Sequence, residues 1–330
     1  METLLPCCVT RFETDDVDDL AHGLTVFEQR FDQLSAGRFH GRFVEVSFGD
    51  VQIYCEHTNQ SIHEMGSIRA NARGFAIAAE VEGRAVFCGS SLTGGELMML
   101  GEGEELDFRT ARTMRTVGLV LPIARLAELR FDAPKAGVGK AGVGSGVICA
   151  NPAATRELQQ LIERMLETFA GRPDGEHEGR MPDAALAQTA LDELETALAA
   201  PALRDPDRAT GRPVWIARRR VVARAMAFIH DNVTEPISIG ALCKEINVSR
   251  RTLQYCFEDV LGVAPLTYLK AVRLNGTRRM LKSSRTLALG VGDIAAQWGF
   301  WHPSHFREDY HRMFGELPSA TRRRAQTTAK

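Results

Sequence analysis

The feature that most constrains this 330-residue chain is a pattern of two short helices and a tight turn, which occurs twice in its last third. In residues 238–249, Ser238 fits a helix N-cap and apolar residues recur at helical spacing. Asn247 suits a left-handed turn, because Asn tolerates positive φ better than most residues. Ser249 then caps a second helix over residues 250–257. The pattern predicts a helix-turn-helix unit whose second helix has an exposed polar face.

The same pattern recurs about fifty residues later. Residues 291–300 predict a short helix that stops at Gly299, and Pro303 fits the first position of a second helix over residues 303–314. A longer helix is predicted between the two units, over residues 265–281. It would hold the two second helices at a fixed separation, so that they could enter successive major grooves about one turn, roughly 10 bp, apart.

These motifs make residues 217–326 similar to the DNA-binding domain of the AraC/XylS family of transcription regulators. The matching residues are Ser249, Leu253 and Phe257 in the first unit, and Ile294-Ala295, Gly299-Phe300, Ser304, Phe306, Tyr310 (in a usual Phe place), Phe314-Gly315 and Pro318 in the second. The resemblance implies a transcription activator that binds double-stranded DNA and acts with RNA polymerase. It also implies an N-terminal cupin-like β-barrel that binds a small-molecule effector and forms a homodimer.

Some positions depart from the family pattern. The family commonly has Arg where Tyr255 and Glu308 stand, and often Lys where Glu258 and His311 stand. A carboxylate accepts hydrogen bonds from cytosine N4 or adenine N6 and repels phosphate. We therefore expect a target sequence unlike the family's typical sites, with Glu308 as a candidate cytosine reader.

The outward residues of the two second helices are the candidate DNA contacts. They are Arg250, Arg251, Gln254 and Tyr255 in the first unit, and Pro303, Ser304, His305, Arg307 and Glu308 in the second. Arg can bind guanine and Gln can bind adenine through two hydrogen bonds each, whereas the alternative is a merely solvated helix face.

Other conspicuous residues of the same region receive a structural interpretation. Arg218–Arg220 and Arg322–Arg324 are interpreted as solvated helix ends or loose phosphate contacts. Trp298 and Phe300 flank Gly299, and they are predicted to pack in the core of the second unit.

The charge is divided unevenly along the chain. Residues 217–330 contain 19 Lys and Arg against nine Asp and Glu, a net charge of +10 in a chain whose total is −2. Residues 1–216 therefore carry a net charge of −12. A basic domain of this kind favours binding to a polyanion such as DNA, because each neutralised phosphate releases condensed counterions.

The N-terminal part has a different pattern. Short segments in which apolar and polar residues alternate are separated by glycine-rich breaks. Strands are predicted at residues 42–48, 51–55, 74–80, 85–90, 96–100, 106–110 and 115–121, and helices at 17–34, 123–129, 153–169 and 182–199. The predicted fold class is α+β, with an N-terminal cupin-like β-barrel and flanking helices and a C-terminal all-α domain containing two helix-turn-helix units. The predicted domains are residues 1–205 and 217–330, joined by a linker at 206–216.

The role of the N-terminal domain leaves alternatives open. Residues 31–41 resemble the ethanolamine-utilisation regulator subgroup, which makes small amines and amino alcohols candidate effectors. The alternative is a domain that only dimerises and binds no ligand. The helix at 182–199 has Leu186, Ala190, Leu194 and Leu198 on one face. This face can pack on the barrel or pair with a partner chain, and the partner chain is slightly favoured. The pocket residues stay unassigned, because strand register is needed to separate inward from outward positions.

Several function classes are disfavoured. No run of 18 apolar residues and no secretory signal is found, and seven cysteines without metal or disulfide spacing indicate reduced thiols in a cytoplasm. His40, His57 and His63 are isolated, with no His-x-His pair, and the nucleophile motif Gly-x-Ser-x-Gly is absent. We therefore expect no catalytic residues, no metal and no cofactor; an enzyme fused to a DNA reader is the remaining competitor.

Overall fold

A computed structural model describes residues 7–128, 145–148, 150–171, 184–199, 212–235, 237–286 and 288–328. The chain divides into two compact units. The β-domain comprises Met1–Phe31, His40–Asn59 and Glu64–Thr210. The helical domain comprises Gly211–Lys330 together with two short segments from the N-terminal part, Asp32–Phe39 and Gln60–His63. Within the described ranges, no helix is both long and apolar enough to cross a membrane.

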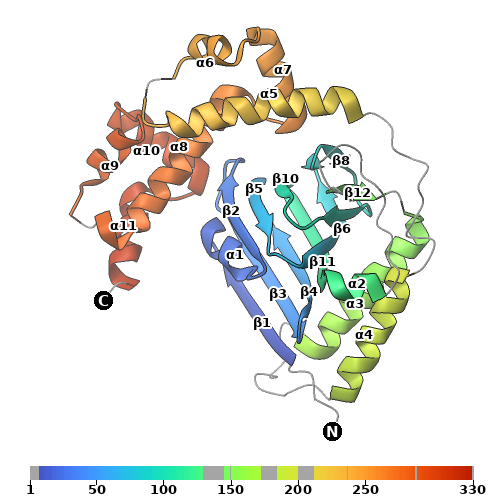
Figure 1. Ribbon diagram of the computed structural model, residues 1–330. Coiled ribbons are helices and arrows are strands. Elements are labelled where there is room, and N and C mark those ends of the chain that lie inside the picture. Colours follow the sequence, from blue (N-terminus) through green and yellow to red (C-terminus); the bar gives the residue numbers. More distant parts are fainter. Residues whose placement is uncertain are drawn as a thin grey trace. The chain divides into compact units, whose positions relative to one another are not determined.

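The strands form two antiparallel sheets (Figure 1). The seven-stranded sheet has the order β1 (Cys7–Thr14), β3 (Gly41–Phe48), β4 (Val51–Thr58), β11 (Thr113–Pro122), β6 (Ala72–Glu82), β9 (Leu97–Leu100) and β12 (Gly146–Ile148). The five-stranded sheet has the order β2 (Phe27–Gln33), β5 (Ile62–Ile68), β10 (Glu105–Arg109), β7 (Ala85–Phe87) and β8 (Ser90–Leu92). The prediction of a β-rich N-terminal domain is confirmed as this pair of sheets, which do not close into a barrel.

One face of the seven-stranded sheet is covered by helices. Side chains of β3, β4, β6, β9 and β11 form one hydrophobic cluster with α3 (Pro152–Ala170) and α4 (Ala184–Ala199), and a shorter helix, α2 (Ile123–Glu128), follows β11 (Figure 1). Leu191, Leu194 and Leu198 of α4 are fully buried in this cluster. Leu194 and Leu198 of the predicted apolar face therefore pack within their own chain, which corrects the slight preference for a partner contact at these two residues. The side chains of Leu186 and Ala190 lie outside the described residues.

The helix predicted over residues 17–34 is wrong in its second half. The helix α1 ends at Gly23 (Val17–Gly23), and the chain then forms the strand β2. The apolar residues of this stretch fit helical spacing, but β2 pairs with β5, and its last residues are buried in succession. Sheet pairing has overridden the local pattern here.

The helical domain contains α5 (Arg212–Asp231), α6 (Ile239–Ile246), α7 (Arg250–Val260), α8 (Pro265–Lys282), a 3₁₀ turn (Ser284–Thr286), α9 (Val291–Gln297), α10 (Pro303–Phe314) and α11 (Pro318–Thr328). Buried side chains from α5 to α10 form a single hydrophobic cluster. Helix α5 begins inside the range predicted as a linker, and residues 206–211 of that range lie outside the described residues. The predicted boundaries at 205 and 217 stay a prediction.

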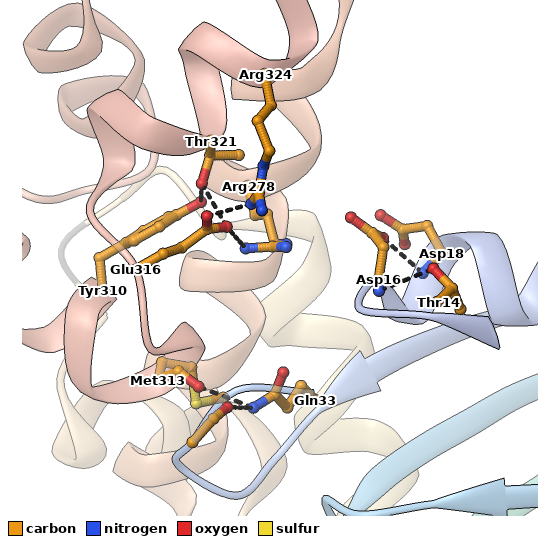
Figure 2. A network of polar contacts seen from close by, with 11 residues as sticks. Thr14, Asp16, Asp18, Gln33, Arg278, Tyr310, Met313, Glu316, Thr321 and Arg324 are labelled. Atoms are coloured by element: carbon orange, nitrogen blue, oxygen red, sulfur yellow. Dashed lines mark hydrogen bonds and ion pairs between the residues drawn. The ribbon is translucent and has the colours of Figure 1, made fainter. Parts of the chain in front are cut away.

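The N-terminal segments of the helical domain are bonded to α8 and to the end of α10. The Asn275 side-chain amide donates to the Gln33 carbonyl (2.9 Å) and its oxygen accepts from the Gln33 N–H (3.1 Å). The Gln33 side chain donates to the carbonyl of Met313 (2.8 Å; Figure 2). Arg279 forms an ion pair with the fully buried Asp32 at 2.7 Å. These contacts satisfy polar groups that burial would otherwise leave costly.

Glu316 lies between α10 and α11 and forms polar contacts to α8 and α11 (Figure 2). Its carboxylate lies 2.5 Å from the Arg278 guanidinium, accepts from the Thr321 hydroxyl at 2.8 Å, and pairs with Arg324. Thr321 also shares a hydrogen bond of 2.9 Å with the buried Tyr310 hydroxyl. Arg278 is only 6% exposed, so removing Glu316 would leave a buried cation without its carboxylate partner.

A close approach of two helices depends on Gly276 in the middle of α8. A Cβ atom at this position would lie 2.1 Å from ring carbons of Trp298, which follows α9. Trp298 and Phe300 pack against the core of the helical domain, as predicted. The indole N–H of Trp298 also lies 2.8 Å from the Met280 sulfur. Glycine is thus required for the Trp298 ring to lie on α8.

We predict that Gly276→Ala lowers the free energy of unfolding by ~1–3 kcal/mol, because the added methyl group overpacks the contact with Trp298. Alanine would otherwise stabilise a helix interior. Urea denaturation of the full chain measures the change. Gly292→Ala in α9 is the matched control, since nothing lies within 4 Å of its added Cβ. Equal stability of the two variants would contradict the packing role of Gly276.

Candidate nucleic-acid interface

The first helix-turn-helix unit has the predicted caps. The Ser238 hydroxyl accepts from the Ala241 N–H at 3.0 Å at the start of α6. Asn247 ends α6 in the left-handed conformation, with φ 56° and ψ 52°. Ser249 then caps α7 by accepting from the Thr252 N–H at 3.1 Å. Local side-chain hydrogen bonds therefore fix the turn that sets α7 against α6.

The four candidate contacts of the first unit are all exposed on α7, and they are Arg250, Arg251, Gln254 and Tyr255. The opposite side of α7 is buried in the core through Leu253, Cys256 and Phe257. Gln254 donates its side-chain amide to Glu258 one turn later. Reading a base with both hydrogen-bonding groups of Gln254 would require this contact to break or to be shared.

A residue outside the predicted set organises this face. Arg218 of α5 stacks over the ring of Tyr255, with its guanidinium carbon 4.3 Å from the ring centre, and forms an ion pair of 2.8 Å with Asp259. The stacking gives Tyr255, which is 53% exposed, a fixed support. The interpretation of Arg218 as a solvated end or loose phosphate contact is therefore wrong. Its two partners lie four residues apart on α7, but nothing in the sequence linked them to α5.

The second unit also follows the predicted pattern. Gly299 has φ +77° after α9, and Pro303 begins α10, which ends at Gly315 with φ 69°. The candidates Pro303, Ser304, His305, Arg307 and Glu308 are all exposed. The buried side of α10 consists of Phe306, Tyr310, Met313 and Phe314. Each second helix thus has one apolar face in the shared core and one exposed face with the candidate contacts.

Aromatic residues before α10 extend the candidate surface. Trp301 is 64% exposed, the highest value among the exposed large hydrophobic residues of the described chain. The next residue, His302, lies with its ring 5.8 Å from that of His305. Trp301 was not among the predicted contacts, although a Trp two residues before Pro303 could have indicated it.

The basic C-terminal helix includes one structural arginine. Arg322 is 6% exposed, and its guanidinium donates to the carbonyls of Leu281, Thr286 and Leu289. It therefore anchors the loop between α8 and α9, and its interpretation as a solvated or phosphate-contacting residue is wrong. Arg324 is exposed but paired with Glu316.

In the described part of the chain, no group of three or more His, Cys, Asp or Glu residues is placed to hold a metal ion. The chemistry of this surface is that of hydrogen-bond donors, a guanidinium-supported aromatic ring and positive charge. These groups can bind phosphate oxygens and base edges.

Comparison with known proteins places the resemblance in this same region. Residues 242–324 match the family model described as "Helix-turn-helix domain". The chain is 36% identical over 101 residues to the "XylDLEGF operon transcriptional activator 3" of Pseudomonas putida, covering 31% of this chain and 30% of that protein. It is 31% identical over 99 residues to the "Probable thc operon regulatory protein" of Rhodococcus erythropolis, covering 30% of each chain.

Among solved structures, the AraC-like transcriptional activator CuxR is similar at 17% identity and a TM-score of 0.41, over 87% of this chain and 100% of that one. The chain spans about a third of the length of the two curated relatives that it matches. The resemblance of the C-terminal part to AraC/XylS-type helix-turn-helix regulators is confirmed. The resemblance of residues 31–41 to ethanolamine regulators stays a prediction.

We predict that Arg251→Ala weakens binding to the specific DNA site by ~1–3 kcal/mol and relaxes the preference at one base pair, because one bidentate contact to guanine is lost. Quantitative gel-shift titration against single-base variants of the site measures both effects. Arg164→Ala, an exposed arginine of α3, makes the same charge change in the β-domain and is the control. Unchanged base preference in the Arg251 variant would refute its role as a reader.

Proposed function

We propose that this protein is a transcription regulator that binds double-stranded DNA in a sequence-specific way through α7 and α10. The observation that carries the proposal is the pair of helix-turn-helix units joined by one hydrophobic core. Both second helices direct their polar candidates away from that core. Since the surrounding region has a net charge of +10, attraction to phosphate would add to the reading of base edges.

The proposal extends to regulation. The protein acts as an activator with RNA polymerase, as a homodimer in the cytoplasm, and it responds to a small catabolite. An amine or an amino alcohol is the effector class that we propose. Effector binding in the β-domain would shift the population of the state in which the helical domain binds DNA.

The proposal predicts a footprint of the full chain on DNA upstream of its own or neighbouring genes. Two adjacent major grooves should be protected, and protection should fade steeply between low and moderate salt because counterions are released on binding. Arg250→Ala with Arg251→Ala should remove protection of one groove, and Ser304→Ala with Arg307→Ala should remove protection of the other.

Two results would contradict the proposal. Absence of protection at every salt concentration, with DNA from the whole neighbourhood of the gene, would rule out a sequence-specific regulator acting there. Protection that both double variants leave unchanged would place the DNA contact outside α7 and α10.

A further inference from the structure

The β-domain contains a cavity between its two sheets, with a volume of about 50 Å³. One water molecule needs roughly 10–15 Å³ on this measure, so the cavity holds a ligand of about three to five non-hydrogen atoms. Its walls are mostly apolar, with Phe27, Phe87 and Phe108 among the lining residues. A small and mostly apolar space of this kind selects by size and by the few polar groups within it.

Two carboxyl groups from opposite sheets line this cavity. Glu56 lies on β4 of the seven-stranded sheet and Glu64 on β5 of the five-stranded sheet, and each residue is only 6% exposed. The Oε1 atom of Glu64 is buried without a hydrogen-bond partner among the described residues. None of the residues that line the cavity is basic. The carboxyl pair therefore has no cation of its own within the cavity.

The fold places a third polar group beside the pair. Tyr54 precedes Glu56 by two residues on β4, and its ring also lines the cavity. The ring lies over Gly118 of the neighbouring strand β11, where a Cβ atom would be 2.5 Å from the Tyr54 hydroxyl. Gly118 thus makes the space in which the Tyr54 ring is held. An aromatic face and a phenol beside two carboxyls suit an ammonium group.

We infer that this cavity binds a small protonated amine, whose ammonium group is held by the carboxylates of Glu56 and Glu64 and whose short carbon chain lies against the aromatic walls. The inference rests on the proposed function, in which the β-domain senses an effector. The ammonium group would supply the positive charge that the cavity lacks. An anion would meet two carboxyls and no basic residue, and a neutral molecule would not favour the ionised form of either carboxyl.

The ionisation of the pair supports the same class of ligand. Burial raises the pKa of Glu56 to about 8, and burial together with the neighbouring Glu56 carboxyl raises the pKa of Glu64. Burial therefore favours the protonated form of both carboxyls while the cavity is empty. Binding of a cation favours the ionised forms and releases up to one proton from each carboxyl, so affinity should rise with pH until the pair ionises unaided.

Other titratable groups near the pair do not change this direction. Burial and the nearby carboxylates raise the pKa of Tyr54, which stays protonated. Glu45 of β3 also acts on Tyr54, but it lies outside the residues that line the cavity, and burial raises its pKa. Cys55 points into the cluster on the other face of the sheet, and burial raises the pKa of its thiol to about 11.

Chain connectivity gives the cavity a route to the DNA-binding helices. Glu64 follows directly on Gln60–His63, a segment of the helical domain. In that domain the His63 ring lies 6.1 Å from the ring of Tyr268 on α8. We therefore expect amine binding at Glu64 to affect the neighbouring His63 and its contact with Tyr268. By linkage, an amine that changes DNA affinity must have its own affinity changed by DNA to the same extent.

The test is calorimetric titration of the full chain with ethylamine and ethanolamine, with ethylene glycol and acetate as neutral and anionic probes of similar size. We expect the two amines alone to bind, with affinity that rises between about pH 6.5 and pH 7.5 by up to about tenfold per pH unit for each proton released. Glu64→Gln and Glu56→Gln should each weaken amine binding at least tenfold. Because glutamine resembles the protonated carboxyl of the empty cavity, the melting temperature without amine should not fall.

Glu45→Gln is the matched control, since Glu45 is a buried carboxyl of the same sheet, bonded to Ser47 and outside the cavity lining. It should bind amines as the unchanged protein does. Failure of both amines to bind, equal binding of ethylene glycol, or undiminished binding by the Glu64 variant would each overturn the inference. A DNA footprint without amine binding would refute only this inference, whereas amine binding without a footprint would refute only the proposed DNA-binding function.

Discussion

The geometry of the helical domain depends on the packing of α8. Its buried side chains, among them Tyr268, Val272 and Leu281, belong to the one hydrophobic cluster that also contains the inner faces of α7 and α10. Eighteen residues of helix span about 27 Å, which is somewhat shorter than one turn of DNA. Two recognition helices that share a core with such a helix cannot change their spacing without breaking that core. The spacing is therefore a property of packing rather than of a flexible linker.

Two segments from the N-terminal part of the sequence are built into the same domain. Asp32 and Gln33 are bonded to Arg279 and Asn275 of α8, and Leu34 belongs to the hydrophobic cluster. The strands that contain or adjoin these segments, β2 and β5, also provide residues that line the cavity of the β-domain. These two short stretches are therefore continuous in sequence with strands that line the candidate effector site.

The helix-turn-helix units could be predicted from sequence because their signals are local. Ser238, Asn247, Ser249, Gly299 and Pro303 each set the backbone through their own side chain or its absence, and the structure has the corresponding caps and turns. The exposure of the nine candidate contacts followed from helical periodicity in the same way.

Features that depend on partners distant in sequence could not be predicted. The strand β2 was expected to be helical because its own residues do not indicate that it pairs with β5. Arg322 and Arg218 were expected to be solvated, yet their partners lie 36 and 41 residues away. Glu56 and Glu64 lie on strands of different sheets, so the register of both strands must be known before the two residues can be assigned to one cavity. A one-residue shift of either strand would turn its carboxyl out of the cavity.

In the proposed function, one rigid core fixes α7 and α10 as two DNA readers on one face of the double helix. The most direct measurement is the affinity of the full chain for its footprinted site after insertion of about 5 bp between the two protected grooves, compared with single-groove sites. The account predicts that the insertion lowers affinity to that of a single-groove site, because half a turn moves the second groove to the opposite face. Affinity that is unchanged by the insertion would contradict a rigid connection through α8.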